Sequence, residues 1–131
     1  MMDIDKQIKY WQEEAKEDWD VALELMGNNR FRHGLFFAHL ALEKILKALV
    51  CKETQETAPK INNLLQLSEL ANIDLAANQS DILAEINAFN IKGLYPDPLS
   101  DSLTEEETQV YIKNAEKMFT WLMNLLHFGQ V

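Results

Sequence analysis

The stretch that decides the fold is Arg30-Phe-Arg-His-Gly-Leu-Phe-Phe-Ala-His-Leu-Ala-Leu-Glu-Lys-Ile-Leu-Lys-Ala-Leu-Val50. Its apolar residues recur at steps of three and four, the spacing of one face of an α-helix: Phe31, Leu35, Ala38, Leu42, Ile45, Leu46 and Leu49. Further apolar residues fill most of the remaining circumference. A helix wetted on one side would not carry so many. We therefore predict a central helix, covered by other helices and, in a dimer, by a second subunit.

Six ionisable residues are set into this helix, and a packed helix must pair or expose each of them: Arg32, His33, His39, Glu43, Lys44 and Lys47. His39, Glu43 and Lys47 follow one another at intervals of four, so they form one ladder along the helix. The favoured interpretation is a polar seam in which Glu43 bridges the other two. In the functional interpretation the seam borders a nucleotide pocket. Lys44 or Lys47 would then contact phosphate and His39 the base or ribose, with Arg32 and His33 within reach of the same ligand.

Helices are predicted on both sides of the central one. Asp3 or Asp5 is a plausible N-cap for the first helix, and Gly27-Asn-Asn29 ends it in a short turn, which makes an antiparallel hairpin. The last helix begins at a capping box formed by Thr104 and Glu107 and runs to about His127. The inward residues are expected to be Ile8, Trp11, Ala15, Trp19, Ala22 and Met26 in the first helix, and Ile112, Ala115, Phe119, Leu122 and Leu126 in the last.

Two shorter helices are predicted between the central and last helices. The first covers about Asn62 to Ala71, with Leu64, Leu67 and Leu70 inward, and the second about Gln79 to Phe89. Lys52 to Pro59 and Asn90 to Ser100 are predicted to be loops, because prolines interrupt a helix. The predicted fold is all-α: a single domain over residues 1–131, an up-and-down antiparallel bundle of about five helices, three long and two short.

Composition narrows the class of protein. The net charge of -9 argues against a general nucleic-acid surface, which needs basic residues. The single cysteine, Cys51, favours a reducing compartment, and no apolar run is long enough to cross a membrane, so we expect a cytoplasmic protein. No second histidine or cysteine stands at a useful distance from His39 and Glu43, so no metal site and no cofactor are predicted.

The motifs in this order resemble the HEPN domain family. Phe37-Ala-His-Leu-Ala-Leu-Glu-Lys-Ile-Leu-Lys-Ala-Leu49 is similar to the family's hallmark helix, with its Ala-x-Glu-Lys-x-x-Lys pattern. Asn62-Asn-Leu64 stands where many relatives read His-Asn-Leu, and Tyr95-Pro-Asp97 where they read Arg-Tyr-Pro-Asp. The resemblance implies a helical bundle that pairs into a homodimer. It further implies that the chain acts beside a minimal nucleotidyltransferase, as in a toxin–antitoxin pair, or as a metal-independent RNase.

The residues weigh against the RNase. Cleavage by a ribose hydroxyl needs a general acid or base near neutrality, which histidine supplies, and a cation that stabilises charge on the phosphate. Relatives supply both from an Arg-x4-6-His motif near the start of the last helix. Here Leu94 occupies the arginine position, and no histidine follows before His127. Arg32 and His39 match the spacing elsewhere, and this keeps an RNase acting across a dimer open as the alternative.

The leading hypothesis is therefore a non-catalytic or weakly catalytic HEPN dimer. It binds a nucleotide, pairs with a nucleotidyltransferase-type protein, or does both. In the nucleotide-binding interpretation Tyr95 stacks on a base and Asp97 meets a ribose hydroxyl. A purely structural helical adaptor is the second alternative.

Overall fold

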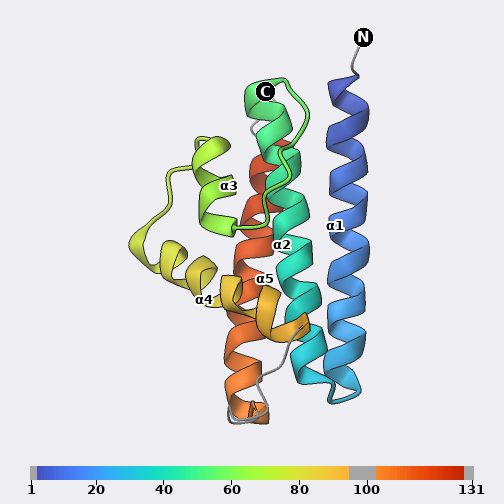
Figure 1. Cartoon of the computed structure of the whole chain (residues 1–131), viewed down its shortest axis with the longest axis vertical. Helices are drawn as coiled ribbons and strands as arrows, with labels where there is room; N and C mark the ends of the chain where they lie inside the picture. Colours follow the sequence, from blue (N-terminus) through green and yellow to red (C-terminus); the bar gives the residue numbers. More distant parts are fainter. Residues whose placement is uncertain (1–2, 95–102, 129–131) are drawn as a thin grey trace.

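A computed structural model describes residues 3–94 and 103–128, which form helices and no strands. Five helices lie within these residues: α1 (Ile4–Gly27), α2 (Phe31–Thr54), α3 (Leu64–Leu70), α4 (Ala77–Leu94) and α5 (Glu105–Phe128) (Figure 1). The predicted all-α fold and its helix order are confirmed.

The hairpin of α1 and α2 forms as expected. Asp3 is the N-cap of α1 and accepts a hydrogen bond of 3.1 Å from the backbone N–H of Lys6. At the other end Asn28 is the C-cap, and Asn29 takes the left-handed conformation with a φ of 58°. Asparagine tolerates this conformation better than most residues, so the turn reverses the chain within three residues.

Helix α2 is the centre of the molecule, because all four other helices pack against it. From Gly34 to Cys51 most of its side chains are buried, including those of Leu35, Leu42, Ile45 and Leu46. The prediction of a helix enclosed on most sides is confirmed within the protomer.

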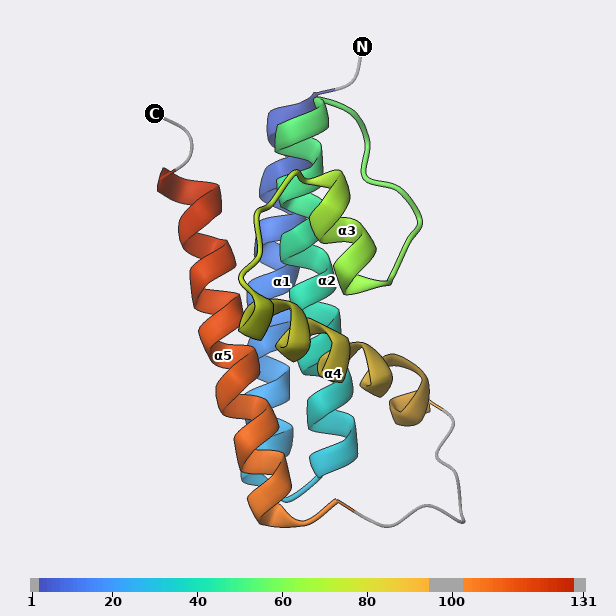
Figure 2. The same cartoon turned by 90° about the vertical axis from the view of Figure 1, so that its left-hand side faces the viewer.

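The other three helices complete the bundle in an arrangement that Figure 2 shows most clearly. Helix α3 lies beside the second half of α2, and α4 crosses the long helices at a steep angle. Helix α5 then runs in the same direction as α2, while α1 runs opposite to both (Figures 1 and 2). The capping box at the start of α5 is present, since the backbone N–H of Glu107 donates to Thr104 Oγ1 at 3.1 Å.

Several predicted boundaries were wrong. Helix α2 continues to Thr54, inside the predicted loop, and α4 extends to Leu94, five residues beyond the predicted end. Helix α4 has 18 residues and is therefore not short. A proline disfavours the helical conformation at the residue before it but not in the earlier turns, so Pro96 in the sequence does not prevent a helix that reaches Leu94. Leu70, predicted to be inward, is 42% exposed at the end of the seven-residue α3. No helix in the described residues is long and apolar enough to span a membrane.

Candidate functional site

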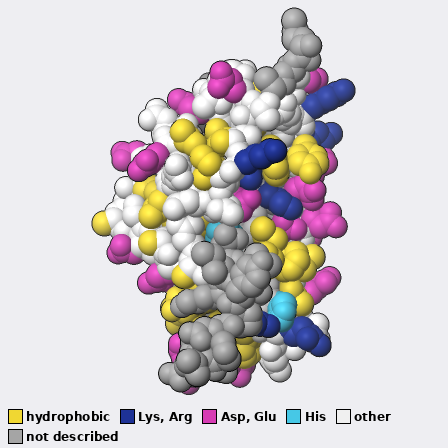
Figure 3. Space-filling model, viewed as in Figure 1, with side chains coloured by type: hydrophobic (Ala, Val, Ile, Leu, Met, Phe, Trp, Pro, Cys, Tyr) yellow, Lys and Arg dark blue, Asp and Glu magenta, His cyan; other side chains and the backbone are white. Residues whose placement is uncertain are grey.

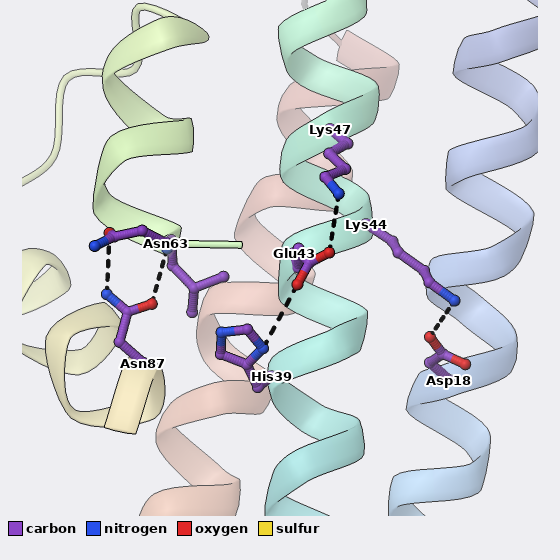
Figure 4. A network of polar contacts seen from close by, with 8 residues as sticks. Asp18, His39, Glu43, Lys44, Lys47, Asn63 and Asn87 are labelled. Carbon is purple, nitrogen blue, oxygen red and sulfur yellow. Dashed lines mark hydrogen bonds and ion pairs between the residues drawn. The ribbon is translucent and has the colours of Figure 1, made fainter. Parts of the chain in front are cut away.

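The His39, Glu43 and Lys47 ladder lies along the face of α2 drawn in Figure 4. Glu43 stands between the other two: its Oε2 accepts a hydrogen bond of 3.0 Å from Lys47 Nζ, and its Oε1 lies 3.8 Å from His39 Nδ1. The residues of all three are buried, and the imidazole of His39 has no exposed surface. The structure therefore brings together the three residues that the spacing predicted, in a seam that Glu43 connects.

The imidazole of His39 points toward the junction of α3 and α4 (Figure 4). Among the described residues neither of its ring nitrogens has a hydrogen-bond partner. Burial lowers the pKa of His39 to about 4; the backbone of Asn62 and the side chain of Asn87 oppose this shift, and the charge of Lys47 adds to it. His39 is therefore neutral at ordinary pH, because an imidazolium would lose its hydration without gaining a full partner.

An asparagine pair joins α3 to α4 beside this histidine. Asn63 is the N-cap of α3, and its Oδ1 accepts from the backbone N–H groups of Leu65 and Gln66. The same oxygen accepts from Asn87 Nδ2 at 3.2 Å, while Asn87 Oδ1 accepts from the backbone N–H of Leu64 at 2.8 Å. The side chain of Asn87 on α4 thereby bonds both the first backbone N–H of α3 and the residue that caps it.

The ammonium groups of the two lysines point to different neighbours. Lys47 Nζ lies 5.2 Å from the centroid of the Trp11 ring on α1, in addition to its contact with Glu43. Lys44 Nζ reaches Asp18 on α1 and lies 2.7 Å from its Oδ2 (Figure 4). Burial alone would lower the pKa of Lys44, but the hydrogen bond and charge of Asp18 outweigh it, so this pKa is raised. Lys44 therefore links α2 to α1 through its ion pair with Asp18 and is not part of the ladder.

Arg32 and His33 lie near the start of α2 and remain accessible. His33 is exposed, Arg32 is half-buried, and their nearest nitrogens are 3.5 Å apart. Seven positions separate Arg32 from His39, which places them about 10 Å apart along the helix axis. Within one protomer these two residues do not form one site. Tyr95 and Asp97 lie outside the described residues.

Three partners in this region were not predicted from the sequence. Asp18 resembles the solvated acidic residues around it on α1, and Trp11 resembles any core aromatic residue. Asn87 carries no helix-periodic signal, because its partners lie on α3. Asn63 stood within a recognised motif, and its place just before an apolar helical run could have identified it as the N-cap. Among the described residues no group of three or more histidine, cysteine, aspartate or glutamate side chains could hold a metal ion.

The chain is thus a small all-α bundle whose long central helix is enclosed and carries a buried polar ladder. The profile of the HEPN domain family matches residues 8–126, and the chain belongs to this family. The crystal structure of TT1696 from Thermus thermophilus has the same fold, with a TM-score of 0.75 over 90% of this chain and 97% of that one, at 20% sequence identity. No curated protein sequence matches the chain significantly.

Proposed function

We propose that the protein is a non-catalytic HEPN homodimer that binds a nucleotide, pairs with a nucleotidyltransferase-type protein, or does both, as one half of a toxin–antitoxin-like pair. The observation that carries this proposal is the state of His39. Its imidazole is fully buried, and burial holds its pKa near 4. A general acid or base must reach the proton that it transfers, so this histidine is badly placed to cleave RNA.

The same geometry narrows the candidate nucleotide contacts. Lys44 is held by Asp18, and Lys47 by Glu43 and Trp11, so neither ammonium is free to take a phosphate without breaking an existing contact. Arg32 and His33 are accessible, and a guanidinium suits the geometry of phosphate oxygens. We therefore assign the phosphate of a bound nucleotide to Arg32 and His33, with Tyr95 and Asp97 kept as proposed base and ribose contacts.

RNA cleavage tests the non-catalytic part of the proposal. The purified protein is incubated with total RNA in EDTA, beside the variant His39→Ala. We expect no cleavage above a buffer control by either protein. Cleavage by the wild-type protein that disappears in the variant would overturn the proposal, in favour of an RNase that uses Arg32 and His39 from two subunits.

Isothermal titration with ATP and GTP tests the nucleotide part. We expect binding that Arg32→Ala weakens strongly and that Lys113→Ala, at an exposed position on α5, leaves unchanged. Co-expression with a nucleotidyltransferase encoded beside this chain tests the partner part, with co-purification in a fixed ratio as the expected result. Failure of both experiments would favour the structural adaptor.

A further inference from the structure

Helices α1 and α5 meet in a small polar contact near the end of α5 that is separate from the ladder on α2. Gln12 on α1 is half-buried, and its Nε2 lies 2.7 Å from His127 Nε2 and 3.7 Å from Met123 Sδ. On α5, Met123 is half-buried and His127 is exposed. One amide nitrogen therefore faces both an imidazole and a thioether.

The two α5 side chains present their lone pairs to the same point. An amide nitrogen donates hydrogen bonds and does not accept them, so the imidazole nitrogen that faces Gln12 is the acceptor. The thioether sulfur of Met123 is an acceptor as well, although a weak one. The hydrogens of the Gln12 amide thus mark the position at which a positively charged group would meet both lone pairs.

Helical spacing brings Met123 and His127 together. Side chains four residues apart on a helix are neighbours on its surface, with Cβ atoms about 5 to 6 Å apart. The methionines of the core are different, since Met26 and Met118 are buried and neither has a histidine one turn further along. Met123 and His127 are therefore a thioether and an imidazole paired at an accessible place.

The end of α5 attracts positive charge. His127 stands in the last turn of this helix, where the backbone carbonyl groups carry a partial negative charge. Lys52 from α2 already donates to the carbonyl oxygens of Leu125 and Leu126, at 3.5 and 3.3 Å. The whole chain has a net charge of -9, and Asp and Glu side chains are scattered over the face that Figure 3 shows. Both the helix end and the overall charge therefore favour a cation beside His127.

The two donor atoms select the class of ion. A thioether sulfur is a soft ligand that suits Cu(I), and an imidazole nitrogen suits copper as well. Magnesium and calcium take oxygen ligands instead, and a structural zinc ion takes a full tetrahedral set of protein ligands. We propose that Met123 Sδ and His127 Nε2 form a surface site for a soft monovalent cation, Cu(I) or its analogue Ag(I). The Gln12 amide leaves this position when the ion enters. The site is independent of the nucleotide and of the dimer.

NMR of the protein labelled at its methionine methyl groups tests the proposal, with Ag(I) in a chloride-free buffer as the probe. We expect the Met123 methyl resonance to shift and to saturate at a single equivalent of Ag(I), while those of the buried Met26 and Met118 stay in place. His127→Ala removes a direct ligand at an exposed position, so it should weaken binding by about tenfold or more and leave the circular dichroism spectrum unchanged.

A second titration with Zn(II) tests the class of ion. Zinc binds thiolate sulfur, imidazole nitrogen and carboxylate oxygen, so we expect it to leave the Met123 methyl resonance in place. An equal response to Zn(II) and Ag(I) would overturn the assignment of the site to a soft monovalent cation.

Three control variants keep both proposed ligands, and each should bind Ag(I) as the wild-type protein does. Met118→Leu changes a buried methionine of the same helix, Gln12→Leu removes the amide that competes with the ion, and Cys51→Ala removes the buried thiol. A Met123 methyl resonance that does not respond to Ag(I), or that responds equally in His127→Ala, would overturn the site. Loss of the response in any of the three controls would also overturn it, because the ion would then depend on groups other than Met123 and His127.

Discussion

Glu43 Oε2 lies 3.0 Å from Lys47 Nζ, one turn further along α2, and both side chains are almost completely enclosed. A pair of this kind loses hydration when the protein folds, and each charge then depends on the other. The effect of burial on the stability of such a pair can be measured, because the chain contains a second Lys–Glu pair with the same spacing whose side chains are exposed.

Glu43→Gln should therefore destabilise the protein. The amide keeps one acceptor for Lys47 but removes the opposite charge, and we expect a loss of about 2 kcal/mol in the free energy of unfolding. Urea denaturation measures this loss. Glu13→Gln is the matched control, since Glu13 pairs with Lys9 at 4.0 Å with both side chains largely exposed. Equal effects from the two substitutions would show that burial of the ladder contributes nothing.

Stability should fall in mild acid because of His39. The unfolded chain binds a proton on this histidine near its ordinary pKa of 6.5, whereas the folded protein resists protonation until about pH 4. The unfolded state therefore holds more protons between these values, and stability is full above this window and declines as the pH falls through it. The decline attributable to His39 reaches about 3 kcal/mol.

His39→Leu separates this contribution from those of other groups. Leucine fills a similar volume without polar atoms, so it should flatten the pH dependence of unfolding between pH 6.5 and about pH 4 while changing stability little at neutral pH. Urea melts at several pH values test this. An unchanged slope would mean that the imidazole is not the group that resists protonation.

Asp18→Asn should loosen the contact between α1 and α2. The substitution removes the charge that holds Lys44 at 2.7 Å, and we expect a loss of about 1 to 2 kcal/mol. Asp20→Asn, an exposed position two residues further along α1, is the control and should have no resolvable effect. Thermal melts of the two variants compare them directly, and a destabilised control would point to the overall charge of α1 instead.

Asn63→Ala should release α3. It removes the oxygen that caps the helix and also accepts from Asn87, at an expected cost of about 1 to 2 kcal/mol. Amide hydrogen exchange in α3 should be faster in this variant than in the wild-type protein, whereas exchange in α5 should be the same in both. Asn62→Ala is the control, because it changes the neighbouring asparagine and leaves the capping oxygen of Asn63 in place. Protection of α3 in the Asn63 variant would contradict the role of the cap.

The long helices and the polar ladder could be predicted from the sequence because both depend on spacing within one helix. The intervals of Leu35, Leu42 and Leu46 determine which side of α2 is buried, whatever packs against it. The true end of α4 could not be predicted, since Gly93 and Pro96 permit a stop anywhere across several residues. The HEPN family assignment, which depended on the order of several motifs, is confirmed by the match over residues 8–126.

The residues that contact the ladder could not be predicted from the sequence, because these contacts depend on how the helices are placed relative to one another. Lys44 and Lys47 are both lysines of one helix, yet a rotation of about 60° between their directions gives them different neighbours. Asp18 receives the first and Trp11 the second. His39 is enclosed because α3 and α4 approach its side of α2, and no interval in the sequence encodes that approach.

The parallel course of α2 and α5 has a practical consequence for labelling. Since α1 runs the other way, Ile4 at its start and Phe128 at the end of α5 emerge at the same end of the bundle (Figures 1 and 2). Arg32 and His33 stand near the opposite end, at the start of α2. A fluorophore or fusion partner joined beyond either Ile4 or Phe128 would therefore leave the guanidinium and imidazole unobstructed.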